Sequence, residues 1–244
     1  MKPLIIFKVG DAVGSLPRES GDFEHWIIDG IGPMQDSIEI IDPRCGDPLP
    51  GIADVGGAII TGSGSMVTDR APWSEDLARW LRTAVPENVP ILGICYGHQL
   101  LAHALGGEVG YHSLGIEIGT VSVRLSPSAH DDALFADFPD EFPAQAVHRQ
   151  SVMRLPPGAV LLAGNDFEPH HAFRVGESAW GVQFHPEFSP EVMAGYIQHL
   201  SEKSNAGSAA AAALLEKARP AEQSSSVLRV FASFVEGRQV RVDG

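Results

Sequence analysis

The sequence predicts an α/β protein built around a mainly parallel sheet. Short apolar runs typical of buried strands alternate with segments whose apolar residues recur at helical spacing, which is the pattern of successive βαβ units. The run VPILGIC at 89–95 is apolar throughout, as expected for a central strand that is covered on both faces. With 244 residues, 44% of them hydrophobic, the chain is long enough to bury a substantial core.

The first half of the chain predicts strands and helices in strict alternation. The first helix ends on glycine, and Pro43 stops the second strand. In the second helix, Ser74 has the residue type and position of an N-cap. Strands are expected at 4–9, 37–42, 57–62 and 89–95, and helices at 22–32, 73–85 and 96–107.

The second half predicts shorter strands that are separated by turns. These strands either extend the sheet or form a small antiparallel layer. They are followed by a helix at 189–203, with Ser189 as its cap and Pro190 at its first position. The strands are expected at 116–125, 144–151, 159–164, 171–176 and 179–184.

Residues 204–226 form an Ala/Ser-rich segment before the last helix, which is expected at 227–237. The middle of this segment favours a helix and its ends favour flexibility. We expect a surface excursion, with a mobile cover or a subunit contact as alternatives. No repeat or linker marks a domain boundary, so we expect one domain over residues 1–244.

Charge and composition exclude several classes of function. The formal net charge is −14, and the 17 Lys and Arg residues form no basic run, which argues against nucleic-acid binding and against docking on an anionic membrane. The early apolar run LIIF is too short for a signal-peptide core, and no stretch approaches the roughly 20 apolar residues of a transmembrane helix. Two cysteines provide no disulfide framework, so we expect a cytoplasmic protein.

Cys95 lies in the motif GICYG, which has the spacing of the G-x-S-x-G nucleophile elbow with Cys in place of Ser. A sharp strand-to-helix turn would expose the side chain above the strand end, and the flanking glycines would let the neighbouring backbone pass closely. Taken alone, the motif fits a nucleophile and a small buried cysteine equally well. Cys45 lies in a loop rich in proline and glycine, and we interpret it as structural or incidental.

A candidate base and its carboxylate follow 90 residues later in the stretch GVQFHPEF. His185 and Glu187 are two residues apart, so in an extended chain their side chains point the same way, and Pro186 favours that conformation. His185 would accept the thiol proton, and Glu187 would orient the imidazole and stabilise its charged form. A surface salt bridge is the alternative for an isolated H-x-E.

Acyl chemistry also needs donors for an oxyanion. The amide of Tyr96, directly after the cysteine at a helix start, is one natural donor. The stretch TGSGS follows a predicted strand, and such turns gather at the carboxyl ends of the strands in a doubly wound sheet, where the elbow also lies.

With these residues assembled, the chain resembles the class I, or triad-type, glutamine amidotransferases, and in particular the glutaminase domain of GMP synthetase and its stand-alone relatives. The matching pieces run in family order from residue 57 to residue 188: AIITGSGSMV, PILGICYGHQLLAHALGGEV, GIEIGTVSV, AVHRQSVMRLPPGAVLLA and WGVQFHPEF. The resemblance implies a three-layer flavodoxin-like fold. It also implies that a thiolate attacks the side-chain amide of glutamine, that ammonia leaves, and that water hydrolyses the glutamyl thioester.

The resemblance also assigns roles residue by residue. It makes Cys95 the nucleophile, His185 the base and Glu187 the acid that orients it, and it places Ser63 and Tyr96 at the oxyanion amides. Gln99 matches a substrate contact, and the stretch 147–150, with Arg149 and Gln150, matches a loop that holds the amino-acid end of the substrate. This chain has VHRQSV where GMP synthetase relatives usually have S-H-G-D before the valine, and GSG where they usually have glycine-glycine-proline.

No cofactor or metal site is expected. TGSGSMV has no lysine and is therefore no Walker motif, and the chain carries no ATP pyrophosphatase segment, so synthetase activity would need a separate synthase subunit that receives ammonia. The substrate is expected to be a small molecule, glutamine or a γ-glutamyl compound. The histidines without a triad role have no clear metal-ligand spacing; among them are His98, His103, His112, His170 and His171.

Three functions remain open at this point. The first is a glutamine amidotransferase-type hydrolase that releases ammonia from glutamine. The second uses the same triad on γ-glutamyl peptides or amides. The third is a binding or regulatory protein that keeps the fold without catalysis. Release of ammonia from glutamine, compared with release of amines from γ-glutamyl conjugates, distinguishes the first two.

Overall fold

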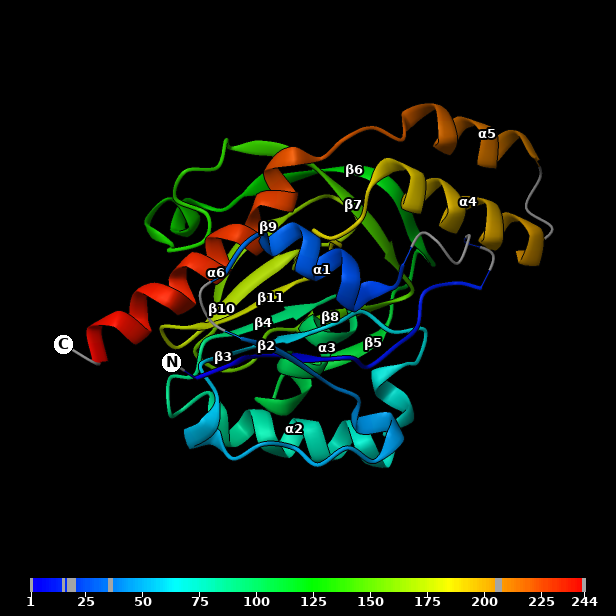
Figure 1. The fold of residues 1–244 in the computed structure, drawn as a ribbon. Helices are drawn as coiled ribbons and strands as arrows, with labels where there is room; N and C mark the ends of the chain where they lie inside the picture. The colour runs from blue at the N-terminus through cyan, green and yellow to red at the C-terminus, as the bar shows by residue number, and fades with distance from the viewer. Residues whose placement is uncertain (1, 15, 17–20, 35–36, 205–207, 243–244) are drawn as a thin grey trace.

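The protein is an α/β structure in which a nine-stranded mixed sheet lies between two layers of helices (Figure 1). The computed structural model describes residues 2–14, 16, 21–34, 37–204 and 208–242. Strand order in the sheet is β2-β1-β3-β4-β11-β10-β9-β6-β7. The predicted three-layer α/β class is confirmed.

One half of the sheet is parallel. Each strand of this half pairs in parallel with its neighbours, so the carboxyl ends of β3, β4 and β11 meet at one edge of the sheet. These five strands are β1 (Leu4–Phe7), β2 (Ile38–Ile41), β3 (Gly57–Ile60), β4 (Ile91–Ile94) and β11 (Ala179–Val182).

The other half is antiparallel, and it extends the sheet as the short strands of the second half of the chain predict. It consists of β10 (Ala172–Val175), β9 (Val160–Gly164), β6 (Glu117–Leu125) and β7 (Glu141–His148). A separate two-stranded sheet pairs β5 (Glu108–Tyr111) with β8 (Gln150–Arg154).

Strand β1 shows why both faces of the sheet must be covered. Leu4 and Ile6 pack into one core cluster, and Ile5 and Phe7 pack into the other, because successive side chains of a strand point to opposite faces. Helices α1 (Phe23–Ile31) and α6 (Glu222–Val242) cover the first face. Helices α2 (Pro72–Ala84) and α3 (Tyr96–Ala104) cover the second (Figure 1).

Helices α4 (Pro190–Ser204) and α5 (Ser208–Lys217) lie side by side near one end of the molecule (Figure 1). As predicted, Pro190 begins α4, and Ser189 caps it by accepting a hydrogen bond from the amide of Val192 at 3.2 Å. In the Ala/Ser-rich segment, α5 packs its partly buried Leu214 and Leu215 against the α4 cluster. Residues 205–207 lie outside the described residues.

Several predicted boundaries are wrong. Helix α6 begins at Glu222, five residues earlier than predicted, so it takes the end of the Ala/Ser-rich segment into the helix. The strand predicted at 144–151 is two strands, because the chain leaves the large sheet after His148 and joins the two-stranded sheet at Gln150. Strand β5 was not predicted, and α3 ends at Ala104 to make room for it.

The prediction that Ser74 caps α2 is also wrong. Pro72 is the first residue of α2, and Ala71, in the cap position, makes no side-chain capping hydrogen bond. Ser74 lies inside the first turn, fully buried, and its hydroxyl contacts the hydroxyl of Tyr96 at 2.7 Å. The expectation of one domain over residues 1–244 stays a prediction. No helix in the described parts of the chain is long and apolar enough to cross a membrane.

Short 3-10 turns connect several of these elements, at Pro43–Cys45, Ile52–Asp54, Val67–Asp69 and Pro127–Asp131.

Replacing Gly93 or Gly97 with alanine should destabilise the protein, because both positions lie against backbone. A Cβ at Gly93 would lie 2.4 Å from the carbonyl oxygen of Gly97, and one at Gly97 would lie 2.5 Å from the carbonyl oxygen of Ile60. We expect each variant to lose about 1–3 kcal/mol of unfolding free energy, measured by urea denaturation.

Gly237→Ala is the matched control for these variants. Gly237 lies in α6, and a Cβ at this position would meet nothing within 4 Å, so alanine should be neutral or add about 0.5–1 kcal/mol. Wild-type stability in Gly93→Ala or Gly97→Ala would contradict the close packing described above.

Candidate active site

Cys95 occupies the turn between β4 and α3. Its backbone has φ 49° and ψ −94°, a region that non-glycine residues rarely adopt and that costs of the order of 1–3 kcal/mol. The turn is held on both sides, since the amide of Cys95 donates to the carbonyl of Val182 at 2.8 Å and its carbonyl accepts from the amide of Gln99 at 3.1 Å. The strand-to-helix turn expected from GICYG is therefore present.

The glycines on either side of Cys95 are needed for space. Gly93 lies against the start of α3, and Gly97 lies against β3, as the clashes of a Cβ at either position show. Both contacts are with backbone, which cannot move aside as a flexible side chain can. The strained turn and its two glycines together let β3, β4 and α3 pack this closely.

His185 and Glu187 form a buried pair just beyond the end of β11. Nδ1 of His185 lies 2.7 Å from Oε1 of Glu187, and the two residues are 3% and 8% exposed. The amide of His185 donates to the carbonyl of Gln145 at 2.7 Å, which fixes the backbone. The ring of Phe188 stacks on the imidazole at a centroid distance of 4.1 Å, so the ring orientation is fixed as well.

Opposing effects set the protonation of His185. Burial lowers its pKa, but the negative charge of Glu187 and the interaction with Cys95 outweigh burial and raise the pKa to about 10. His185 therefore holds a proton through neutral pH in this geometry. A carboxylate on one side and a thiol on the other are the surroundings expected for the base of a thiol nucleophile.

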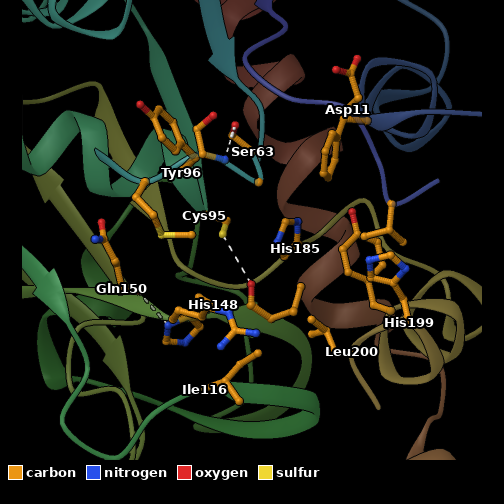
Figure 2. Close-up of a pocket in the computed structure, with 18 of the residues that line it drawn as sticks. Asp11, Ser63, Cys95, Tyr96, Ile116, His148, Gln150, His185, His199 and Leu200 are labelled. Carbon is orange, nitrogen blue, oxygen red and sulfur yellow. Dashed lines mark hydrogen bonds between the residues drawn. The ribbon is translucent and has the colours of Figure 1, made fainter. Parts of the chain in front are cut away.

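Cys95 and His185 open into a cavity of about 330 Å³ at the carboxyl edge of the parallel strands. The thiol of Cys95 contacts the carbonyl of Val147 at 3.7 Å (Figure 2). In the same view, Ser63 and Tyr96 lie above the thiol and His185 lies beside it. Glu187 contacts His185 from outside the cavity lining.

Ser63 and Tyr96 lie where amides can face the cavity. Tyr96 begins α3, so its N–H is among the first of the helix, which have no acceptor within the helix. Ser63 follows β3, and the chain at Gly10 presses on it so closely that a Cβ on Gly10 would lie 2.4 Å from Cα of Ser63. The amide of Val9 donates to Oγ1 of Thr61 at 3.0 Å, which ties the two loops together.

The three predicted substrate contacts also line the cavity. Nε2 of Gln99 donates to the carbonyl of Gln150 at 2.7 Å and to Oε1 of Gln183 at 3.0 Å. The side-chain nitrogen of Gln150 donates to Thr68 at 2.6 Å, while its buried Oε1 accepts no hydrogen bond from the described residues. Arg149 is exposed at the rim.

The family described as glutamine amidotransferase class-I matches residues 24–200, which include Ser63, Cys95, His185 and Glu187. The chain belongs to the class I glutamine amidotransferase family. It is a glutamine amidotransferase-type enzyme similar to the glutamine-hydrolyzing subunits of GMP synthases, as the following relatives indicate.

Two relatives and one solved structure illustrate the membership. A glutamine-hydrolyzing GMP synthase subunit from Archaeoglobus fulgidus is 36% identical over 157 residues, which cover 62% of this chain and 79% of that protein. The gamma-glutamyl peptidase 3 of Arabidopsis thaliana is 27% identical over 179 residues, which cover 70% of this chain and 66% of that protein.

The crystal structure of a glutamine amidotransferase from Thermotoga maritima superposes with a TM-score of 0.75 at 22% identity, over 96% of this chain and 97% of that chain. At this identity the likeness concerns the fold alone. Other GMP synthases that match are longer, and the chain spans 26% of the length of one of them.

A buried polar network behind the amidotransferase cavity was not predicted. Glu117 accepts from Nε2 of His148 at 2.9 Å, and it also contacts His171 at 3.2 Å and the amide nitrogen of Asn165 at 2.9 Å. Burial raises the pKa of Glu117, but these hydrogen bonds and charges prevail and hold it well below its usual value. The other ring nitrogen of His148 contacts the carbonyl of Gln150, so the network supports the turn at 147–150.

One wall of the cavity was also missed. The loop after β1 contributes Asp11 and Val13, and helix α4 contributes Tyr196, His199, Leu200 and Lys203. The spacing of these four α4 residues, i, i+3, i+4 and i+7, is that of one helix face and could have signalled a shared surface. The residues described contain no group of three or more His, Cys, Asp or Glu placed to hold a metal ion.

The contact between Ser74 and Tyr96 should stabilise the start of α3. Burial raises the pKa of Tyr96 to about 12, and its hydroxyl needs the partner that Ser74 provides. We expect Ser74→Ala to lower the unfolding free energy by about 1–3 kcal/mol, because it leaves the buried hydroxyl unpaired.

The double variant Ser74→Ala/Tyr96→Phe should recover part of that loss, since it removes both partners. Denaturation of the four proteins as a double-mutant cycle measures the coupling. Ser226→Ala, at an exposed hydroxyl in α6, is the control. Strictly additive effects of the two substitutions would contradict the coupling.

Proposed function

We propose that this protein hydrolyses the side-chain amide of glutamine, with Cys95 as nucleophile, His185 as base and Glu187 as the carboxylate that orients it. The observation that carries the proposal is the convergence of a strained cysteine turn and a buried His–Glu pair on one cavity. A structural cysteine needs neither the strain nor the buried base.

In the acylation step the sulfur of Cys95 attacks the amide carbon of glutamine. The thiol proton resides on His185, whose raised pKa suits this role. The amides of Ser63 and Tyr96 donate to the oxygen as it gains negative charge. When the tetrahedral intermediate collapses, the C–N bond breaks, His185 gives its proton to the departing nitrogen, and ammonia leaves a γ-glutamyl thioester.

In the deacylation step water replaces ammonia. His185 now takes a proton from the water as its oxygen attacks the thioester carbon, and the same two amides hold the second oxyanion. The C–S bond breaks, the sulfur regains a proton, and glutamate leaves. Glu187 stays hydrogen-bonded to Nδ1 throughout, so it keeps Nε2 directed towards the reacting atoms.

The amino-acid end of the substrate is proposed to lie against the turn at 147–150. The unpaired Oε1 of Gln150 is a buried acceptor for the substrate ammonium group. The guanidinium of Arg149 at the rim is a donor for its carboxylate. Gln99 supports the turn through the carbonyl of Gln150.

The acceptor of the ammonia is proposed to be a separate synthetase subunit. Two relatives support this, because each is named as one subunit of a GMP synthase, which implies at least one further subunit, and the chain covers 79% and 95% of their lengths. The longer GMP synthases, of which the chain spans about a quarter, are consistent with the same division. GMP formation itself is therefore proposed only for such an assembly.

A second candidate is hydrolysis of γ-glutamyl peptides or amides with the same triad. The match to a gamma-glutamyl peptidase supports it, as does a cavity wall that extends beyond the thiol to α4. A purely binding or regulatory role is the weakest of the three, because such a role needs no base paired with the thiol.

The proposal predicts that a chloroketone analogue of glutamine labels Cys95. We expect labelling and glutaminase turnover to be lost together in Cys95→Ser, with turnover falling by about 10³-fold or more. Mass spectrometry locates the label, and coupled glutamate detection follows turnover. Cys45→Ser is the matched control, since Cys45 is exposed and distant from the His–Glu pair, and it should behave as wild type. Labelling at Cys45 with none at Cys95 would refute the assignment.

Glu187→Gln should change the pH dependence of turnover. The charge of Glu187 raises the pKa of His185, so its removal lowers that pKa and shifts the alkaline limb of kcat/KM to lower pH. We also expect kcat to fall by about 10²–10⁴-fold. Glu202→Gln, at an exposed position on α4, is the control for loss of one negative charge. An unchanged alkaline limb in Glu187→Gln would show that Glu187 does not set the protonation of His185.

A further inference from the structure

One face of α4 forms the cavity wall on the His185 side. Tyr196, His199, Leu200 and Lys203 line the cavity together, and Tyr196 hydrogen-bonds with the backbone of Val13 in the facing loop. Figure 2 shows Gln150 on one side of Cys95, with His185, His199 and Leu200 on the other. The cavity thus continues past the thiol in the direction away from the turn at 147–150.

The chemistry determines what would lie in that part of the cavity. The departing nitrogen must be within reach of His185, because His185 supplies its proton. Anything attached to that nitrogen then extends towards α4. Glutamine has nothing attached there, so its ammonia would leave this space empty, whereas a γ-glutamyl conjugate would fill it.

The charges of this region favour an anion. Asp11 is its one acidic lining residue among those described, and Arg44 holds it with contacts of 2.6 and 3.1 Å, while Lys8 lies 3.5 Å away. The Arg44 hydrogen bonds keep the pKa of Asp11 below its usual value. Its charge is therefore already balanced by two cations, which leaves little to attract a cationic group.

Lys203 has no such balance. Within the described parts of the chain, no carboxylate lies within 4.0 Å of its ammonium group, and His199 adds a ring N–H one turn earlier on the same helix face. In a chain of net charge −14 with only 17 Lys and Arg residues, an unpaired lysine at a cavity mouth is a local attraction for anions. Tyr196, Leu200 and Val13 supply apolar surface beside it.

We propose that this wall is a leaving-group subsite for amines that carry a carboxylate, that is, for the amino-acid or peptide part of a γ-glutamyl amino acid or peptide. The subsite rests on the proposed thiol chemistry of Cys95. Lys203 and His199 bind the carboxylate, and the apolar residues contact the side chain of the departing amino acid. They are specificity residues and take no part in the bond changes.

The reaction balances without any further reagent. The sulfur of Cys95 attacks the γ-carbonyl carbon, the C–N bond breaks, and His185 protonates the nitrogen, so that the free amino acid or peptide leaves. Water then hydrolyses the thioester to glutamate and regenerates the thiol. One amide and one water become one carboxylic acid and one amine.

A matched pair of ligands tests the carboxylate. γ-Glutamylglycine and γ-glutamylglycinamide differ only in the terminal carboxylate and amide. Calorimetry with Cys95→Ser measures their binding without turnover, and kcat/KM with the wild-type enzyme measures their hydrolysis. We expect the carboxylate form to bind about 5- to 10-fold more tightly and to be hydrolysed with a similar preference, and we expect the preference to shrink at high salt.

Lys203→Met, in both the wild-type and Cys95→Ser backgrounds, should abolish most of that preference, and Lys203→Arg should restore it. Lys217→Met, on α5 and outside the cavity, is the control and should keep the preference and the glutaminase rate. Equal affinity for the two ligands, tighter binding of the amide, or an unchanged preference in Lys203→Met would each overturn the subsite.

Such a failure is distinguishable from failure of the proposed function. If glutamine is hydrolysed and Cys95 is labelled while the ligand pair is not discriminated, the subsite is wrong and the glutaminase chemistry stands. If Cys95 is acylated by neither glutamine nor a conjugate, both proposals are wrong.

Discussion

The strained backbone of Cys95 is the constraint on which the rest of the site depends. An L-residue at φ 49° and ψ −94° is unfavourable by itself, so the surrounding packing must hold it there. That packing consists of backbone contacts at Gly93 and Gly97 and of hydrogen bonds to Val182 and Gln99. Because all of these contacts are with main chain, the thiol is placed by rigid elements and projects beyond the strand end rather than into the core.

The parallel half of the sheet then brings the partners of the thiol to it. Strands β3, β4 and β11 are neighbours and run in the same direction, so Ser63, Cys95 and His185 follow three adjacent carboxyl ends. No long side chain or induced movement is needed to assemble them. The imidazole is fixed in turn by Glu187 on one edge and by the ring of Phe188 on its face, and its protonation follows from that buried carboxylate.

Around this centre the cavity has two unlike walls. On one side the turn at 147–150 is held from behind by Glu117 and His148, a buried polar arrangement that orders backbone and side chains for the amino-acid end of a substrate. On the other side α4 presents an amphipathic face with Lys203 at its end. The first wall suits what every γ-glutamyl compound shares, and the second faces the part in which such compounds differ.

Local sequence determined much of this protein. The alternation of apolar runs with helical periodicity predicted the α/β class and most elements, and G-x-C-x-G and H-P-E marked the Cys95 turn and the His185–Glu187 pair, since two or four residues of spacing suffice to define them. Tertiary structure alone decided the rest: the change of sheet at Arg149, the pairing of β5 with β8, and the placement of α4 beside the thiol. It also balanced the charge of Asp11 through Arg44, 33 residues away. These features depend on contacts between distant segments, which the spacing of residues along a single chain does not encode.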